Sequence, residues 1–378
     1  MMSAASQPAR PGAARRGSVV IAGGGTGGHL YPGLALADAL GEQGFDVTFV
    51  GTASGIEARV VPAAGYPLRL LPGQQLRGGG AGRAAAGLAA VARGAVRGRG
   101  LLGELRPRLV VGVGGYASVA VVLAARLSGI PIVLLEQNVV PGAANRFLGR
   151  LAARVCVGFA ESARFFPRGR AAHTGNPIRR ELLGGATRAP RARPGLLVFG
   201  GSAGAHRLNV AVVEALAALG AAARGLEVTH QTGPADLEEV RRAYRALALA
   251  ARVEPFIADM GGAYAAADLV IARAGAMSCA EITAVGLPAI LVPYPHAADD
   301  HQRLNAEVLV AAGAAEMILD RECDGERLAA AIRGLVDDPV RRAAMATRAR
   351  ALGRPDAAEQ VAAECVRLIG SGGVPPMS

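Results

Sequence analysis

Short apolar runs alternate along the chain with longer stretches that are rich in alanine and leucine. Each run is apolar at nearly every position, and turn residues followed by a helical pattern come after it. Continuously apolar strands are typical of parallel sheets covered on both faces, and their alternation with helices predicts repeated β–α units. We expect strands at 18–23, 46–51, 68–72, 109–114, 131–137 and 154–159, and again at 195–201, 226–233, 251–257, 268–275 and 287–294.

This layout occurs twice in the 378 residues. A strand that enters a glycine-rich turn appears as "VVIAGGGTGGH" and again as "LLVFGGSAGAH", and residues 173–195 between them have the Gly, Pro and Arg content of a domain junction. The pattern predicts an α/β protein with two Rossmann-like domains whose parallel sheets face a central cleft. We expect a disordered basic tail at 1–17, domains at 18–174 and 175–349, and a helix at about 350–370 that packs back on the first domain.

Composition and charge narrow the classes of partner. Hydrophobic residues make up 51% of the chain and aromatic residues only 4%, so the cores must be built from small aliphatic side chains. The formal net charge is +11, and every basic side chain is an arginine. A positive field of this size favours phosphorylated ligands or anionic membranes. Since few aromatic side chains are present to stack on bases, we expect no nucleic-acid partner.

Two further classes of structure are not expected. The four cysteines are dispersed and form no CxxC pair, so neither a zinc site nor a disulfide framework is predicted. The longest uncharged run, 109–125, is slightly short for a bilayer and is interrupted by glycines, so we expect no transmembrane segment.

One segment, 65–103, contains no acidic residue and interleaves arginines with apolar residues. This pattern is typical of a basic amphipathic helix on an anionic lipid surface, although an ordinary solvated helix would show it too. We expect the segment to meet the membrane through Arg69, Arg77, Arg83, Arg93, Arg97 and Arg99.

The first glycine-rich turn formally matches the dinucleotide fingerprint GxGxxG at Gly23, Gly25 and Gly28. That fingerprint needs an acidic residue at the end of the next strand to hold a ribose, but the next strand ends in residues 51–54, "GTAS". Five glycines exceed what a tight turn requires, so we expect a ligand here, either an acceptor or a leaving group.

The second glycine-rich turn has the spacing of a nucleophile elbow at Gly200, Ser202 and Gly204. A hydrolase would need a downstream acid and histidine, for which Asp268 or Asp299 with His301 can be nominated. We favour a different role, in which Ser202 hydrogen-bonds a phosphate at a helix N-terminus beside the N–H groups of Ala203 and Gly204.

A third block, 272–306, contains Glu281 early in a predicted helix, where a carboxylate can accept two hydrogen bonds from a ribose diol. The alternative is a helix-start glutamate favoured by the helix dipole. His296, Asp299, Asp300, His301 and Gln302 then cluster in sequence, but neither a second such cluster nor a DxD pair accompanies them. We therefore expect no metal and no cofactor.

Taken together, several stretches resemble the MurG family of bacterial cell-wall N-acetylglucosamine transferases: "GGGTGGHLYPGLALA", "GVGGYAS", "LLEQN", "GNPIR", "FGGSAGA", "ARAGAMSCAE" and "VPYPHAADDHQRLNA". The resemblance runs in order from about Val19 to about Ala315. It implies a GT-B fold and an inverting, metal-independent enzyme. That enzyme would move N-acetylglucosamine from UDP-N-acetylglucosamine to the C4 hydroxyl of the muramoyl sugar of lipid I, giving lipid II. It would be peripheral, on the cytoplasmic face of the cell membrane.

The resemblance also implies roles for residues of the C-terminal domain. Ser202 matches the diphosphate contact, the backbone of Ile257 the uracil contact, and Glu281 the ribose ligand. The remaining matches to the donor pocket are Ala276, Met277, Ser278, Cys279, Ala280, Gln302 and, facing the donor across the hinge, Arg179. Ala203 and Ala274 depart from the family, which frequently has glutamine and serine there, and each departure removes a polar side chain near this pocket.

In the N-terminal domain, the resemblance implies donor-sugar contacts by Thr26, Gly27, Gly28 and Asn138, and an acceptor-diphosphate contact by Gly114, Gly115 and Tyr116. His29 matches the general base. Asp38, a substrate-assisted route, or a merely structural histidine at a helix start are alternatives for that role. Two other classes of function also stay open: a hydrolase that uses Ser202, and a nucleotide-sugar-binding module without catalysis.

Overall fold

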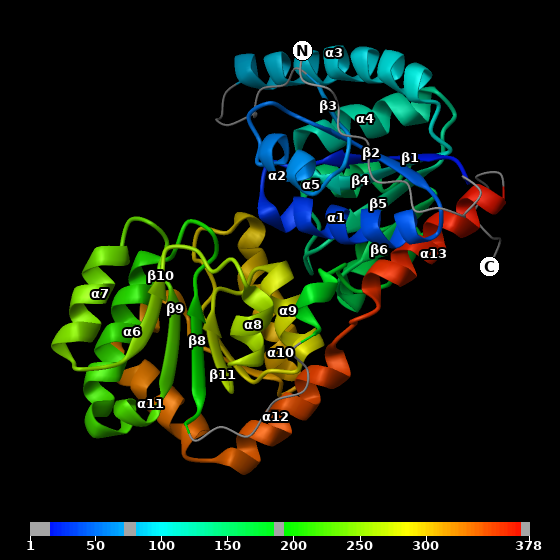
Figure 1. The fold of residues 1–378 in the computed structure, drawn as a ribbon. Coiled ribbons are helices and arrows are strands. Elements are labelled where there is room, and N and C mark those ends of the chain that lie inside the picture. Colours follow the sequence, from blue (N-terminus) through cyan, green and yellow to red (C-terminus); the bar gives the residue numbers. More distant parts are fainter. Residues whose placement is uncertain (1–15, 72–80, 185–192, 372–378) are drawn as a thin grey trace. The chain divides into compact units, whose positions relative to one another are not determined.

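The computed structural model describes residues 16–71, 81–184 and 193–371, which form two compact units (Figure 1). The first unit contains the chain up to Arg179 together with residues from Asp356 onward, and the second contains Arg180–Pro355. These divisions lie a few residues beyond the expected boundaries at 174 and 349. Most of the expected tail, 1–15, lies outside the described residues.

The N-terminal unit is built on a seven-stranded parallel sheet of order β3-β2-β1-β4-β5-β6-β7. This is the strand order of a Rossmann fold with one added edge strand. The strands are β1 (Ser18–Gly23), β2 (Asp46–Gly51), β3 (Leu68–Leu70), β4 (Leu109–Gly114), β5 (Ile132–Glu136), β6 (Arg154–Val157) and β7 (Ala171–His173). The helices are α1 (Gly27–Glu42), α2 (Glu57–Ala63), α3 (Ala81–Leu105), α4 (Gly115–Leu127), α5 (Ala143–Leu148) and α13 (Ala357–Gly370), with a 3-10 turn at Ala160–Phe165.

Alternate residues of β1 face two different hydrophobic cores. Val19 and Ile21 pack with α1 and α13, whereas Val20 and Ala22 pack with α4. Both faces of the strand are therefore covered, which explains its continuously apolar sequence. Val361, Cys365 and Leu368 place α13 in the first of these cores, so the end of the chain completes the unit in which the chain begins.

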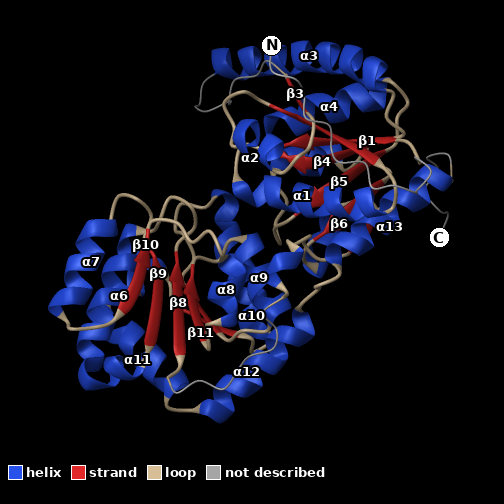
Figure 2. Ribbon diagram, in the orientation of Figure 1, coloured by secondary structure: helices blue, strands red, loops and turns tan. Residues whose placement is uncertain are grey.

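The C-terminal unit has a six-stranded parallel sheet of order β10-β9-β8-β11-β12-β13. The strands are β8 (Gly195–Phe199), β9 (Glu227–Gln231), β10 (Ala251–Glu254), β11 (Leu269–Ala272), β12 (Ala289–Leu291) and β13 (Ala315–Met317). The α-helices are α6 (His206–Leu219), α7 (Leu237–Ala246), α8 (Met260–Ala265), α9 (Ala276–Val285), α10 (His301–Ala311), α11 (Gly325–Val336) and α12 (Pro339–Leu352). Short 3-10 turns lie at Arg180–Leu182, Gly220–Gly225, Ala298–Asp300 and Asp320–Glu322. In Figure 2 the strands of each unit form a layer between helices.

The predicted fold class is confirmed: two Rossmann-like domains, each with a parallel sheet. All eleven expected strands are present, and the sequence pattern missed only the short edge strands β7 and β13. The four cysteines are free thiols and are buried. Among the described residues, only 206–225 are long and apolar enough to cross a membrane by length and composition. Leu208, Val212 and Leu216 in that stretch belong to the core of the C-terminal unit.

Candidate active site

The first glycine-rich turn, 23–28, follows β1 and leads into α1. Gly23, Gly24 and Gly25 all have positive φ angles, which glycine adopts at little cost. The carboxylate of Glu57, at the start of α2, holds this turn from behind: it accepts the Gly25 N–H at 2.7 Å and the Thr52 N–H and hydroxyl at 2.9 Å each. Burial would raise the pKa of Glu57, but these hydrogen bonds outweigh it and lower the pKa.

Glu57 is 1% exposed because glycines surround its carboxylate. A Cβ atom added to Gly24 would lie 2.4 Å from the carboxylate, and one added to Gly55 would lie 2.0 Å from it. Gly24 of the first turn therefore makes room for a protein carboxylate, together with Gly55 of the loop after β2. This role explains the glycine at position 24 but not those at 25, 27 and 28, where an added Cβ would not meet Glu57.

His29 lies in the first turn of α1, half-buried, with its Nδ1 3.4 Å from the Thr26 hydroxyl. Its ring packs on Gly114, since a Cβ at that position would lie 2.7 Å from the His29 Cδ2. The Gly24 N–H donates to the Gly114 carbonyl at 3.3 Å. The predicted base and two of the predicted turns, 23–28 and 114–116, thus meet at the ends of β1 and β4.

Two other predicted residues of this unit have structural contacts. Asp38 lies nine residues beyond His29 on α1, about 13 Å along the helix, and accepts the Tyr66 hydroxyl at 2.5 Å. Asp38 is therefore not in the same place as His29 and does not fit the role of alternative base. The Tyr116 hydroxyl donates to the Ala90 carbonyl of α3 at 2.8 Å, so in this structure it joins two helices.

Asn138 follows β5, and its backbone is fixed on both sides. Its N–H donates to Glu136 at 2.9 Å, and its carbonyl accepts the Ser162 hydroxyl at 2.7 Å. Glu136 also accepts the Asn145 side-chain amide at 2.9 Å. Burial raises the pKa of Glu136, and the hydrogen bonds from Asn138 and Asn145 only partly offset this.

The guanidinium of Arg179 lies over the ring of Tyr31, with its Cζ 4.8 Å from the ring centroid. Tyr31 belongs to α1, the helix that also carries His29, and both residues of this cation–π pair lie in the N-terminal unit. Such a contact contributes on the order of 1 kcal/mol and fixes the plane of the guanidinium.

The second glycine-rich turn, 200–205, follows β8. Ser202 is exposed, but α6 begins only at His206, so Ser202 precedes the helix instead of capping it. The Gly204 N–H, which was expected to be offered to a phosphate, donates to the Gly201 carbonyl at 2.9 Å. The expectations that the Gly204 N–H is offered to a phosphate and that the helix begins beside Ser202 are therefore wrong, whereas phosphate contacts by Ser202 and Ala203 stay predictions.

Gln231, the last residue of β9, holds this second turn. Its side-chain Nε2 donates to the Gly201 carbonyl at 2.8 Å, and its Oε1 accepts the Ile257 N–H at 3.2 Å. One carboxamide thus joins the turn that carries Ser202 to the backbone of Ile257. The next residues, Thr232 and Gly233, lie against the same turn, because a Cβ on Gly204 would meet the Thr232 carbonyl at 2.0 Å.

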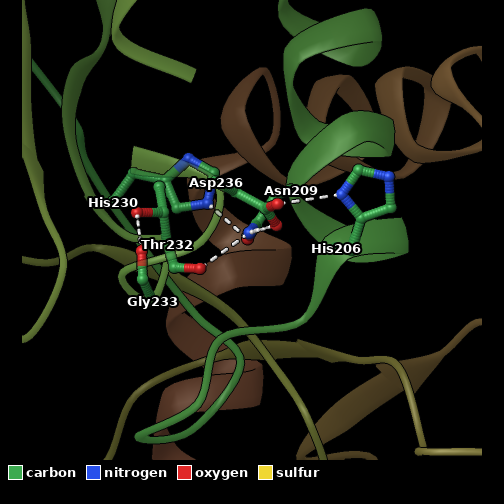
Figure 3. A network of polar contacts seen from close by, with 6 residues as sticks. All are labelled: His206, Asn209, His230, Thr232, Gly233 and Asp236. Carbon is green, nitrogen blue, oxygen red and sulfur yellow. Dashed lines mark hydrogen bonds and ion pairs between the residues drawn. The ribbon is translucent and has the colours of Figure 1, made fainter. Parts of the chain in front are cut away.

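A polar network, buried at Asn209, His230 and Thr232 and exposed at His206, supports the Gln231 segment (Figure 3). The Asn209 side-chain amide donates to the Thr232 carbonyl at 2.8 Å and to Asp236 at 2.7 Å. Its Oδ1 lies 3.1 Å from Nε2 of His230, and His206 pairs with the other oxygen of Asp236 at 3.0 Å. Because Asn209 Oδ1 can only accept, His230 must carry its proton on Nε2.

The other ring nitrogen of His230, Nδ1, then accepts the Tyr244 hydroxyl at 2.9 Å. His230 is fully buried, and burial lowers its pKa to about 3, against a smaller opposing effect of Asp236. The imidazole is therefore neutral at physiological pH and serves as a fixed hydrogen-bonding group.

Glu281 lies in the second turn of α9, half-buried, and accepts the Tyr264 hydroxyl at 2.9 Å. Met277, Ser278 and Ala280 of the same helix are partly exposed, as a pocket lining requires, whereas Ala276 is 8% exposed. Cys279 is 1% exposed, and burial raises its pKa to about 12. Its side chain faces the core, so the expected lining role is wrong for the Cys279 thiol.

The loop after β12 is tied to the start of α10. Gln302 accepts the Tyr294 N–H at 3.0 Å through its side-chain oxygen. Arg273, which follows β11, donates to the carbonyls of Val292 and Pro293 at 3.1 and 3.0 Å and pairs with Asp320 at 2.6 Å. These contacts fix the segment that carries Gln302 against the end of β11.

The nominations for a hydrolase triad do not fit. Asp268 hydrogen-bonds Gly195, the first residue of β8, at 2.8 Å, whereas Ser202 follows the opposite end of that strand. His301 directs Nδ1 to the Ala298 carbonyl at 2.6 Å, where a triad would place a carboxylate. In the described part of the chain, no group of three or more His, Cys, Asp or Glu side chains comes together in a way that could hold a metal ion.

The predicted basic helix is α3, and it packs on α4. Gly94, Gly98 and Leu102 are buried, whereas Arg93, Arg97 and Arg99 are exposed and Val96 is 74% exposed. Arg69 is ion-paired with Glu104 at 2.9 Å. Arg77 and the side chain of Arg83 lie outside the described residues and side chains.

The comparisons with known proteins decide the family. The model of the glycosyltransferase family 28 N-terminal domain matches residues 19–157, and that of the C-terminal domain matches residues 195–361. The chain belongs to glycosyltransferase family 28. The first match includes α3, and the second extends into the first turn of α13. The two family models therefore cover most of the described helices and strands.

Relatives in this family are similar over nearly their whole length. Two proteins named UDP-N-acetylglucosamine--N-acetylmuramyl-(pentapeptide) pyrophosphoryl-undecaprenol N-acetylglucosamine transferase match over 355 residues each. The one from an Anaeromyxobacter species is 49% identical, covering 93% of both chains, and the one from Geobacter sulfurreducens is 47% identical, covering 92% of this chain and 98% of the relative. The crystal structure of Acinetobacter baumannii MurG is 32% identical with a TM-score of 0.77, covering 93% of this chain and 99% of that one.

Sequence reasoning missed the residues that hold the predicted ones. Glu57, Glu136, Gln231 and Arg273 are all polar residues at 8% exposure or less, and each one fixes a loop at the end of a strand. Three of them share one signal that could have found them: they are the last residue of an apolar strand or the residue directly after it.

Proposed function

We propose that this glycosyltransferase moves N-acetylglucosamine from UDP-N-acetylglucosamine to the C4 hydroxyl of the muramoyl sugar of lipid I. The products are lipid II and UDP, and the anomeric centre is inverted. The observation that carries the proposal is the 47–49% identity, over more than nine-tenths of the chain, to enzymes whose name states this transfer. The enzyme is thus a hexosyltransferase of peptidoglycan biosynthesis.

The chemistry is a single displacement. The C4 oxygen of the acceptor forms a bond to C1 of the donor sugar while the bond from C1 to the UDP oxygen breaks, and the C4 proton passes to a base. His29 is the proposed base, since it is half-buried and lies beside Thr26 and Gly114 at the meeting point of the two turns. Positioned proton transfer contributes about 10²–10⁴-fold to a rate.

The donor contacts proposed for the C-terminal unit are the turn of Ser202 for the diphosphate, the Ile257 backbone for the base, and Glu281 for the ribose. The Tyr264 hydroxyl already orients the Glu281 carboxylate at 2.9 Å. A positioned carboxylate can accept both hydroxyls of a ribose diol. Departing UDP is stabilised by backbone N–H groups and by arginine, and the proposal includes no metal ion.

A UDP-release assay tests this function. Purified protein with UDP-N-acetylglucosamine and a lipid I analogue should release UDP and form the disaccharide lipid, at equal rates with and without EDTA. UDP binding without release would mean a binding module, and loss of release under EDTA would overturn the metal-free part. His29→Ala should keep UDP affinity but lose about 10²-fold or more in turnover. The matched control is His173→Ala, a substitution at the exposed end of β7.

We further propose that the enzyme is peripheral at the cytoplasmic face of the membrane and binds anionic lipid through α3. Arg93 and Arg97 are four residues apart and exposed, so they lie on one face of the helix with Val96 beside them. Each arginine near an anionic surface contributes about 1 kcal/mol to binding. The opposite face of α3 is occupied by α4.

Vesicle co-sedimentation tests the membrane contact. Arg93→Glu combined with Arg97→Glu should abolish binding to vesicles that contain phosphatidylglycerol but leave UDP release from a soluble acceptor unchanged. The control, Arg242→Glu with Arg245→Glu on the exposed side of α7, changes the net charge equally and should still sediment. Equal loss of sedimentation in both variants would reduce the effect to net charge and contradict a specific role of α3.

A further inference from the structure

The two glycine-rich turns are held from behind by residues of different charge. The turn after β1 is held by Glu57, which follows β2, and the turn after β8 is held by Gln231, which ends β9. Glu57 begins α2, the helix after β2, whereas Gln231 is the last residue of β9; β2 pairs with β1, and β9 pairs with β8. Each of these two clamp residues thus comes from the β–α segment of the neighbouring strand, but Glu57 is an anion and Gln231 is neutral.

The clamps also use opposite groups of the turn. Glu57 accepts the Gly25 N–H, so this donor of the turn is no longer available to a ligand, and the carboxylate places a negative charge beside the turn. Gln231 donates to a carbonyl, that of Gly201, which also accepts the Gly204 N–H. A carbonyl oxygen near a phosphate repels it, and both lone pairs of the Gly201 carbonyl are occupied by these two hydrogen bonds.

The consequence for an anionic ligand follows from the sign of the charge. A buried carboxylate close to a ligand site repels a diphosphate, because the protein between them screens the two negative charges poorly. A neutral carboxamide at the same place exerts no such repulsion. We propose that Gln231 is the positioning residue that makes the turn of Ser202 accept a diphosphate, by orienting the Gly201 carbonyl without adding charge. This inference rests on the proposed function and deepens it.

Gln231 acts on two parts of the nucleotide at once. Its Oε1 holds the Ile257 N–H, beside the proposed contact with the base, while its Nε2 holds the proposed diphosphate turn. The network around His230 and Asn209 fixes the adjoining Thr232, so the carboxamide has a rigid support (Figure 3). Two different substitutions of Gln231 can therefore separate the effect of an added charge from the effect of losing these two hydrogen bonds.

Two variants make that separation. Gln231→Glu keeps an acceptor for the Ile257 N–H but cannot donate to Gly201 while ionised, and it places a carboxylate behind the turn. Gln231→Met has a similar length, removes both hydrogen bonds and adds no charge. The readout is the ratio of the dissociation constants for uridine and UDP, measured by calorimetry on the full-length protein. Uridine lacks the diphosphate, so the ratio reports the contribution of the diphosphate alone.

We expect Gln231→Glu to leave uridine binding close to wild type and to weaken UDP binding about tenfold or more, which lowers the ratio by the same factor. Lowering the pH until the new carboxyl is protonated should restore part of it, because a protonated Glu can donate to Gly201. Gln231→Met should weaken both ligands together and change the ratio less. Gln43→Glu, at the end of α1, is the control for net charge and should keep the wild-type ratio.

A wild-type ratio in Gln231→Glu, with normal UDP binding by the wild-type protein, would overturn this inference alone. An equal drop in the ratio for Gln43→Glu would also overturn it, because the effect would then come from net charge. Failure of the wild-type protein to bind UDP would overturn the proposed function as well, so the two failures are distinguishable.

Discussion

Gly98 of α3 and Ala124 of α4 lie so close that a Cβ on Gly98 would be 3.1 Å from the Cβ of Ala124. Gly94 has the same relationship to Ala120, at 3.0 Å. The two helices therefore approach each other through glycine on one side and alanine on the other. Gly100, on the exposed side of α3, has open space around it.

Gly98→Leu should therefore force α3 away from α4 and lower the free energy of unfolding by about 1–3 kcal/mol. Gly100→Ala should raise it by about 0.5–1 kcal/mol, because alanine reduces the freedom of the unfolded helix without meeting any atom. Thermal unfolding of both variants checks this. A stabilised Gly98→Leu protein would contradict the close packing.

A second prediction compares two ion pairs with the same N–O distance but different burial. Arg154 and Glu364 are 2.9 Å apart with side chains 11% and 13% exposed, whereas Arg69 and Glu104 are 2.9 Å apart with side chains 51% and 65% exposed. Glu364→Gln should cost on the order of 3 kcal/mol of stability, because it leaves a largely buried arginine without its counter-charge. Glu104→Gln should cost less than about 1 kcal/mol. Similar urea midpoints for the two variants would contradict the assignment of α13 to the first unit's core.

His230 gives a prediction about pH. Its pKa is about 3 in the folded protein, against about 6.5 in an unfolded chain. As pH falls below about 6.5, the unfolded chain takes up a proton that the folded one does not, so stability falls until about pH 3. The contribution of this one group is about 1.4 kcal/mol per pH unit. His230→Gln should lower stability at pH 7 but show a correspondingly shallower decline between pH 6 and 4 in urea unfolding. Parallel declines for the two proteins would mean that His230 is not buried neutral.

Tyr264 should act through Glu281. Tyr264→Phe removes the hydroxyl that donates to the Glu281 carboxylate, and one hydrogen bond to a charged group is worth about 1.5–3 kcal/mol. We expect the KM for UDP-N-acetylglucosamine to rise about tenfold while kcat changes little. With a donor that lacks both ribose hydroxyls, the variant and the wild type should behave alike. A Tyr264→Phe effect of equal size on that donor would show that the tyrosine acts elsewhere.

The strands could be predicted from the sequence because parallel sheets bury both faces. Val19–Ala22 and Leu196–Phe199 are apolar at every position for this reason. β7 and β13 escaped detection because their residues, "AAH" and "AEM", form no run of bulky apolar side chains, whereas the equally short edge strand β3 lies in the leucine-rich run 68–72. The resemblance to a family indicated which glycine-rich turns and polar residues to examine, but not how they are held.

The contacts that hold the site could not be read from the chain, because they join residues far apart in sequence. Glu57 is 32 residues from Gly25, and Gln231 is 30 residues from Gly201. The direction of individual side chains could not be predicted from the sequence either. Cys279 is buried in the core, and the Tyr116 hydroxyl donates to a carbonyl of α3. Both depend on which neighbours tertiary packing supplies, and spacing along the chain does not record that.

The place of α13 has a consequence for how the protein is made. Its side chains Val361, Cys365 and Leu368 belong to the core of the unit that begins with β1. In sequence, the whole of the second unit lies between α13 and the rest of the first unit. During synthesis, the whole of Arg180–Pro355 is made before α13. The first unit to be synthesised is therefore the last to be completed, and until then the apolar face of α1 that α13 covers is open to chaperones.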